Sequence, residues 1–525
     1  MKIILGQRVR SLPLAAMFAF LCITAHAQQQ LAAPPHAALG NSSLAPSSGN
    51  ISEQQIANRL QSLAATVSPE LRAYALEQLV DLGVVRPYRD RKALLEEAFT
   101  LATLSPNALK VQFVSGNLDS HAGYMSYASS LELDTLSLES HAVIEMTKVD
   151  VAEAQNMFTD MRIPRAKPVN CSSGLVYDFS SYFKMVEALY VSDDNINGER
   201  EKAPYILQRV LWNLSSSTEV SPAIRLISNL KLQGSRREEA EIALAHAFNQ
   251  IDADDRSFEY SFIDIVSSLY SVPDQNTAGF RVLLNAVRDY VVRSLSGNVC
   301  GNDTGSARLK SGDESIIGTS VKHLNGLNAL LKANGLDVIE PDEIVPASID
   351  DAVRSNGEEY WTTAPARGLE LAFRSLRTDI EKESDQPSEW QNEGQTLLDN
   401  LRSWSRPSDD TASADWFMQK ALLYYQLVIV IPRASILYPE LLTDYITFLA
   451  EPPNNRETEL FWLWTVVRAI NHTDETRGHQ KRTAIVSALY QVNNPSITVL
   501  LLITELQSGD KRNQVVAGPL VHDSR

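Results

Sequence analysis

An acidic, asparagine-rich segment between two predicted helices carries the pattern D-x-[DN]-x-[DN]-G, which opens a calcium-binding loop. Asp193, Asn195 and Asn197 place an oxygen-bearing side chain at every second position, and Gly198 follows where the loop must turn sharply. Alternating oxygens around such a turn can wrap a hard cation. The twelfth position, which should supply a bidentate Glu, is Pro204. Asp and Asn also favour solvated turns, so the three residues are calcium candidates that compete with a plain turn.

Two further patterns match fragments of catalytic sites. Ser181 and Lys184 have S-x-x-K spacing, and residues 310–312 (Lys-Ser-Gly) match the second element of penicillin-recognising enzymes. Those enzymes need that element on a strand, and this sequence predicts almost no strands. One polar turn also collects four potential metal ligands, namely His472, Asp474, Glu475 and His479. A charged, solvated turn explains them equally well. We therefore expect no cofactor and no resident metal, and we lean against an enzyme.

Glycan chemistry is the most substantial enzymatic alternative. Six of the seven tryptophans fall between residues 361 and 464. Exposed aromatic rings can stack on sugars, and carboxylate pairs can cleave glycosidic bonds. The candidates stand at predicted helix junctions and are Glu358, Glu359, Trp361, Asp410 and Trp416. Core packing explains tryptophans in helices, and acidic residues at helix starts match the helix dipole, so structural roles compete with this interpretation.

The first 27 residues have the three parts of an export signal. Lys2, Arg8 and Arg10 form a basic start without acids, an apolar run follows, and the segment closes on Ala-His-Ala with cleavage after Ala27. The apolar run of residues 12–25 is shorter than the roughly 20 residues that span a bilayer. We expect an exported protein, periplasmic or extracellular, with no stable membrane insertion.

Cleavage would leave two cysteines, Cys171 and Cys300, both in loop-like sequence. An exported protein folds where disulfides persist, so we predict a Cys171–Cys300 bond. Two unpaired thiols are the alternative. Cysteines without neighbouring histidines do not predict a zinc site.

The charge of the chain argues against nucleic acid as a partner. The net charge is −17, from 47 Lys and Arg against 64 Asp and Glu. An acidic surface repels phosphate backbones, and no basic run with interleaved aromatics offsets it. Anionic membrane surfaces are disfavoured for the same reason.

Apolar residues recur at helical spacing along most of the chain, with caps and breakers between the segments. The capping box at Ser52 and Gln55 and the Ser68-Pro69 pair predict the first two helix starts. The only short candidate strand covers residues 109–114. Beyond the first three helices, we predict helices over residues 139–146, 151–161, 179–191, 202–214, 223–232, 236–251, 258–270, 279–295, 320–331, 349–354, 367–382, 389–404, 415–431, 438–450, 458–470, 482–490 and 496–506.

These patterns predict an all-α protein, best described as an irregular α-solenoid of helical hairpins like those of tetratricopeptide or HEAT repeats. A closed (α/α) toroid is the alternative. Residues 92–106 and 236–252 resemble tetratricopeptide helices, with small alanines where paired helices approach. No fixed repeat period runs along the chain, so we assign no family.

The predicted organisation has six parts. They are a signal peptide (1–27), a flexible linker (28–51), an N-terminal helical half (52–297), a Gly/Ser/Asn-rich seam (298–318), a C-terminal helical half (319–508) and a polar tail (509–525). The sequence favours a scaffold that binds a protein, a peptide or an envelope component. The alternative is an (α/α)-ring protein that binds or cleaves polysaccharide.

Overall fold

A computed structural model of the protein is predominantly helical. It describes residues 52–114, 120–162, 165–166, 175–197, 203–252, 255, 257–296, 314–340, 364–382, 387–408, 410–451, 453, 456–471 and 478–516. The prediction of an all-α fold is confirmed for these residues.

Twenty helices and two short strands make up the described elements. Those up to residue 197 are α1 (Glu53–Ala64), α2 (Pro69–Asp81), α3 (Tyr88–Ala102), β1 (Lys110–Phe113), α4 (His121–Ser129), α5 (Thr135–Thr147), α6 (Val151–Asp160), β2 (Leu175–Asp178) and α7 (Ser180–Asn197). The next are α8 (Ala203–Trp212), α9 (Ser217–Asn229), α10 (Ser235–Phe248), α11 (Phe258–Ser271), α12 (Ala278–Ser296) and α14 (Glu314–Ala333). The last are α15 (Ala364–Lys382), α16 (Pro387–Ser403), α17 (Asp410–Val430), α18 (Leu437–Ala450), α19 (Arg456–Ile470), α20 (Gly478–Leu489) and α21 (Pro495–Val516).

The first helices begin where local chemistry predicts. The Ser52 side chain accepts a hydrogen bond from the backbone N–H of Gln55, and the Gln55 side chain accepts one from the Ser52 backbone, so the capping box is complete. Ser68 precedes α2 and Pro69 is its first residue, where the missing N–H of proline leaves no bond unmade. Gly83, with φ of +64°, follows the end of α2 and supplies the left-handed turn that other residues adopt at a cost.

The two strands pair antiparallel, with Lys110 opposite Asp178 and Phe113 opposite Leu175. The sequence predicts β1. It does not predict β2, because four residues are too few to show an alternation of apolar and polar side chains. Helix α4 was also missed. Its sequence, His-Ala-Gly-Tyr-Met-Ser-Tyr-Ala-Ser, has no apolar period.

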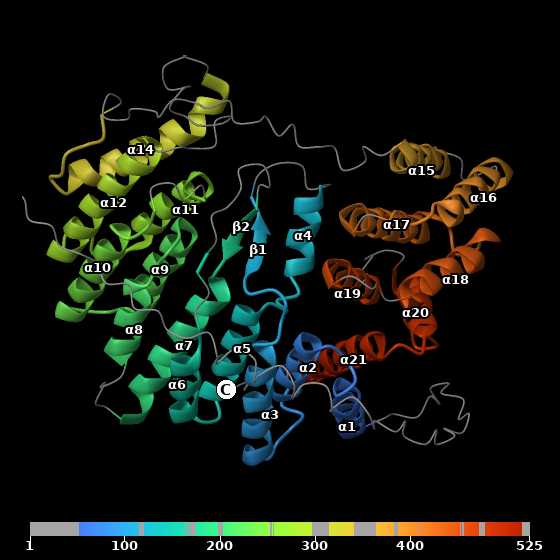
Figure 1. Ribbon diagram of the computed structural model, residues 1–525, viewed down its shortest axis with the longest axis horizontal. Helices are drawn as coiled ribbons and strands as arrows, with labels where there is room; N and C mark the ends of the chain where they lie inside the picture. Colours follow the sequence, from blue (N-terminus) through green and yellow to red (C-terminus); the bar gives the residue numbers. More distant parts are fainter. Residues whose placement is uncertain are drawn as a thin grey trace, which may run out of the picture. The chain divides into compact units, whose positions relative to one another are not determined.

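Many helices contact the helix two places along the chain. Helix α8 packs on α10, α10 on α12, α7 on α9 and α9 on α11. Near the other end of the described chain, α21 packs against α1, α2, α19 and α20, and α17 packs against α18 and α19 (Figure 1). Contacts between α4 and α19 also join early and late segments. Helices α2, α5, α19 and α21 are thereby brought to one region.

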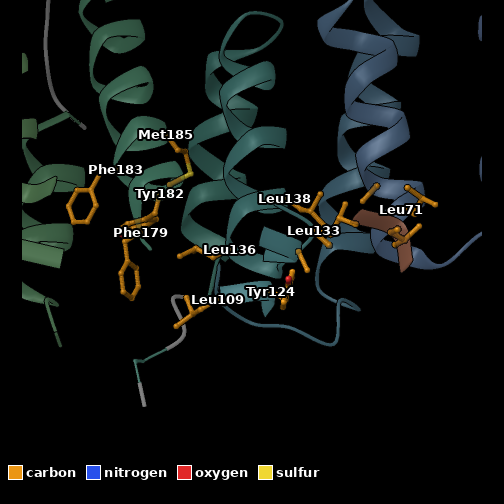
Figure 2. Close-up of a cluster of buried hydrophobic side chains, with 14 of the residues drawn as sticks. Leu71, Leu109, Tyr124, Leu133, Leu136, Leu138, Phe179, Tyr182, Phe183 and Met185 are labelled. Atoms are coloured by element: carbon orange, nitrogen blue, oxygen red, sulfur yellow. The ribbon is translucent and has the colours of Figure 1, made fainter. Parts of the chain in front are cut away.

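The hydrophobic core continues through these contacts. Figure 2 shows part of it, with Leu71 of α2 beside Leu133 and Leu138 near the start of α5, and with Phe179 and Tyr182 where α7 begins. All five side chains are buried. Burial of a large apolar side chain contributes about 1.5–3 kcal/mol, so this layer fixes α2 and α5 firmly against each other.

Parts of three further predictions fall on described residues. Helix α7 extends through Asn197, so the backbone of Asp193, Asn195 and Asn197 is helical, where the calcium candidate requires a loop. The side chains at these positions lie outside the described residues. Helix α14 packs against α11 and α12 of the first predicted half, and residues 50–525 form one compact unit. None of the described helices is long and apolar enough to cross a bilayer.

Several predicted features lie outside the described residues. They are the signal peptide with Ala27, the linker, Cys171, Cys300, the Lys-Ser-Gly of residues 310–312, the helix over 349–354, Glu358, Glu359, Trp361 and residues 472–477.

Candidate functional site

A cavity of about 530 Å³ lies between α2, α5, α19 and α21. This volume falls within the 300–1,000 Å³ or so that is usual for ligand sites. The apolar lining residues are Leu71, Leu131, Leu133, Leu463, Trp464, Val467, Leu500 and Ile503. The polar lining residues are Tyr74, Gln78, Ser130, Glu132, His141, Arg468, Asn471, Thr504 and Gln507.

The helices line the cavity with regularly spaced side chains. Helix α19 and the residue directly after it contribute residues 464, 467, 468 and 471, and α21 contributes residues 500, 503, 504 and 507. Both sets have the spacing i, i+3, i+4 and i+7, which places side chains on one face of a helix. Gln78 of α2 and Gln507 of α21 close the wall, because the Gln507 amide donates to the Gln78 carbonyl oxygen at 2.9 Å.

Glu132 is the centre of a polar cluster at one side of the cavity. Its carboxylate lies 2.8 Å from the Lys110 ammonium and 3.2 Å from Nε2 of His141. Lys110 also pairs with Asp178, the residue opposite it in the strand pair, at 3.0 Å. The hydrogen bond with His141, joined by the one with Lys110, lowers the pKa of Glu132 to about 2. Glu132 is therefore ionised throughout the physiological range.

The backbone at Glu132 is held in the left-handed region, with φ of +56°. This conformation costs a non-glycine residue about 1–2 kcal/mol. Backbone strain of this kind persists only where the surrounding contacts hold the residue in place, and it is often found at functional sites. Here the turn between α4 and α5 directs a carboxylate into the cavity wall between Lys110 and His141.

Glu77 lies on the other side of the same imidazole. Its Oε2 is 3.9 Å from Nδ1 of His141, and its side chain is buried. Neither carboxylate oxygen has a hydrogen-bond partner among the described residues. Burial, reinforced by the charges of Glu145 and Glu132, raises the pKa of Glu77 well above its usual range. The ring of His141 thus lies between a carboxylate whose pKa is lowered, at 3.2 Å, and one whose pKa is raised, at 3.9 Å.

Arg468 of α19 also lines the cavity. Its guanidinium carbon is 4.4 Å from the ring centre of Tyr425 and 5.2 Å from that of Trp464. The Trp464 ring in turn stacks on Tyr127 of α4, with centroids 5.4 Å apart and planes 17° apart. Stacking on aromatic rings holds a guanidinium in a fixed plane. Among the described residues, Arg468 makes no ion pair with a carboxylate.

The candidates from sequence do not meet at this cavity. Trp416 packs on α17 with its ring edge toward Trp404 and Phe448, and its indole N–H donates to the Trp404 carbonyl at 3.2 Å. Asp410 is the first residue of α17, and its side chain lies outside the described residues. Ser181 is buried on α7, with Oγ 3.5 Å from Glu132, whereas Lys184 of the same pattern is exposed.

Sequence reasoning missed Glu77, Glu132, His141 and Arg468. The sequence does contain one indication of the buried charges, namely charged residues within apolar helical stretches. Glu77 is the single charge in the run Ala73–Val80, and Glu139 and His141 interrupt the apolar stretch at the start of α5. Charged groups inside an apolar helix are rarely buried without a role or a partner. No local sequence pattern indicates that Arg468 lines a cavity, because a cation in the last turn of a helix is common.

A smaller cavity of about 250 Å³ lies between α8 and α10, beside the half-exposed Trp212. It is mostly apolar and has no charge cluster comparable to that around Glu132. In the described part of the chain, no group of three or more His, Cys, Asp or Glu side chains is placed to hold a metal ion.

Comparison of the chain with protein-family models, with curated proteins and with solved structures finds no match to any of them.

Proposed function

We propose that the protein is an exported α-helical scaffold that binds a peptide, and that the peptide occupies the cavity between α2, α5, α19 and α21. The observation that carries this proposal is the lining itself. Apolar side chains of α2, α19 and α21 line the cavity together with a few fixed polar groups, among them Glu132 and His141. Sites of this composition bind ligands by burying apolar surface, while a small number of polar groups sets orientation.

The arrangement of the helices supports the scaffold part of the proposal. Contacts between alternate helices, such as α8 with α10 and α10 with α12, are those expected of stacked hairpins. We propose on this basis that the helices form an irregular α-solenoid, a fold that presents long surfaces to peptides. Fold alone does not define a function, so the binding proposal rests on the cavity.

Blocking the cavity tests the proposal. Asn471 is exposed, lines the cavity and directly follows the last residue of α19. Asn249 is exposed and directly follows the last residue of α10, away from this cavity. We expect Asn471→Trp to reduce capture of N-acetylated, randomised tetrapeptides at least about tenfold, the factor that a loss of some 1.4 kcal/mol produces. Asn249→Trp should leave capture unchanged.

The readout is affinity selection of the peptide pool by the purified full-length mature protein, followed by mass spectrometry of retained peptides. Equal retention by the wild type and Asn471→Trp would contradict the assignment of the cavity. Absence of retained peptides on the wild type would contradict the function itself.

A further inference from the structure

The charged groups of the cavity differ in how much of their hydrogen-bonding capacity is already used. Glu132 accepts from both Lys110 and His141. Gln78 and Gln507 bond to each other. Arg468, by contrast, lines the cavity with its guanidinium against the rings of Tyr425 and Trp464, and it has no ion pair with a described carboxylate. Its donors are the strongest ones in the lining that no described carboxylate occupies.

A guanidinium held in one plane is suited to a particular ligand group. Its fork of N–H donors matches the two oxygens of a carboxylate, and the pair is frequently bidentate. The flanking Tyr425 and Trp464 rings limit rotation of the Arg468 head, so less conformational entropy is lost when a carboxylate binds. The molecule as a whole has a net charge of −17. A cation that faces a cavity in such a protein would attract anionic groups that the remaining surface repels.

We infer that the cavity recognises the free carboxyl terminus of a peptide, with Arg468 as the residue that binds the terminal carboxylate. This inference rests on the proposed function, since it specifies which part of the peptide enters the cavity. Apolar lining residues of α19 and α21, such as Val467 and Ile503, would then receive the last side chains. Glu132 and His141 line the same cavity and would face the peptide backbone.

The test compares two chemically matched peptide pools on the purified full-length mature protein. Both pools are N-acetylated, randomised tetrapeptides without Asp or Glu. One ends in a free carboxylate and the other in a carboxamide. The wild type should retain the acid pool about 10- to 100-fold better than the amide pool, the ratio expected for a charge-assisted hydrogen-bonded pair. Arg468→Gln should abolish this preference, and Arg468→Lys should restore only part of it, because an ammonium keeps the charge without the fork.

Arg209→Gln is the matched control. Arg209 also lies in the last turn of a helix and over an aromatic ring, 5.1 Å from the centre of Phe158, but it is not part of the cavity. Retention of the amide pool by Arg468→Gln at the wild-type level shows that the variant is folded.

The outcomes separate the two proposals. Equal retention of acid and amide by the wild type overturns the carboxylate inference and leaves peptide binding in place. A preference for acid that survives Arg468→Gln also overturns it, because another group must then hold the carboxylate. Loss of amide retention by Arg468→Gln overturns it as well, since Arg468 would then maintain the site as a whole. Retention of neither pool by the wild type overturns the proposed function and the inference together.

Discussion

At the scale of single residues, the region around α5 has an unusual number of buried carboxylates. Glu77 and Glu139 are buried, and each has at least one carboxylate oxygen without a hydrogen-bond partner among the described residues. Removing a carboxylate from water favours its protonated form. Burial raises the pKa of Glu139 to about 7 and that of Asp134, the N-cap of α5, to about 6. The stability of this region therefore depends on pH.

Glu139→Gln should remove part of that dependence. The pKa of Glu139 is higher in the folded state than the value of about 4.3 in an unfolded chain. The contribution of Glu139 to the free energy of unfolding is thus fully present below about pH 4.3 and is lost as pH rises through about 7. We expect Glu139→Gln to be more stable than the wild type by on the order of 2 kcal/mol at pH 8, and to differ little at pH 4.5.

Urea unfolding at the two pH values measures this effect. Glu239→Gln, at an exposed position of α10, is the control and should change stability equally at both. A Glu139→Gln variant with the same pH dependence as the wild type would show that folding does not raise the pKa of Glu139.

At the scale of elements, Asp255 joins the starts of two helices. One carboxylate oxygen accepts from the backbone N–H of Ser217 at 2.6 Å, and the other accepts from the backbone N–H of Ser257 at 3.1 Å. Ser217 is the first residue of α9, and Ser257 directly precedes α11. A single side chain therefore satisfies N-terminal donors of both helices.

Asp255→Ala should destabilise the protein by about 1–4 kcal/mol, since a helix cap contributes roughly 0.5–2 kcal/mol and two caps are lost. Asp264→Ala, at an exposed position of α11, should stay within about 0.5 kcal/mol of the wild type. Chemical denaturation at constant pH provides both values. Equal stability of the two variants would show that Asp255 does not cap these helices.

Gly279 sets the distance between α10 and α12. A Cβ at this position would lie 2.6 Å from Oε2 of Glu241 and 2.9 Å from Cα of Glu238, so the helices would have to separate. We expect Gly279→Ala to cost about 1–3 kcal/mol. Gly368→Ala on α15 meets nothing within 4 Å and should stabilise by about 0.5–1 kcal/mol. Thermal unfolding of both variants measures the contrast, and a neutral Gly279→Ala would contradict the close approach.

The elements differ in how far local sequence predicts them. The starts of α1 and α2 depend on residues within one turn, such as Ser52 with Gln55, and both were predicted. Strand β2 depends on pairing with β1, as when Tyr177 lies opposite Val111. No local pattern encodes that partner. The boundary of α7 was placed six residues too early, because Asp193 and Asn195 favour turns in isolation.

At the scale of the whole molecule, the candidate site depends on contacts that sequence patterns do not reveal. Gln78 and Gln507 are 429 residues apart in the chain and yet share a hydrogen bond in the cavity wall. Each lining helix has a recognisable periodic face. Which faces meet is decided by the packing of α21 on α1 and α2 (Figure 1). The helical class could be predicted, and the site could not.

Export of the protein and the Cys171–Cys300 disulfide are predictions from the sequence that concern the whole molecule. We expect the secreted or periplasmic protein to begin at Gln28 and to carry a Cys171–Cys300 bond. Intact mass spectrometry should give the mass of residues 28–525, with an increase of two hydrogens after reduction. A mass that includes residues 1–27 would contradict cleavage, and an unchanged mass after reduction would show free thiols.

Hydrogen–deuterium exchange of the full-length mature protein tests the central claim most directly, because it maps where a peptide binds without any substitution. Saturation with the free-acid tetrapeptide pool should slow amide exchange in α2, α5, α19 and α21, which line the cavity. Unchanged exchange in these four helices, or slowing confined to α8 and α10, would contradict the account.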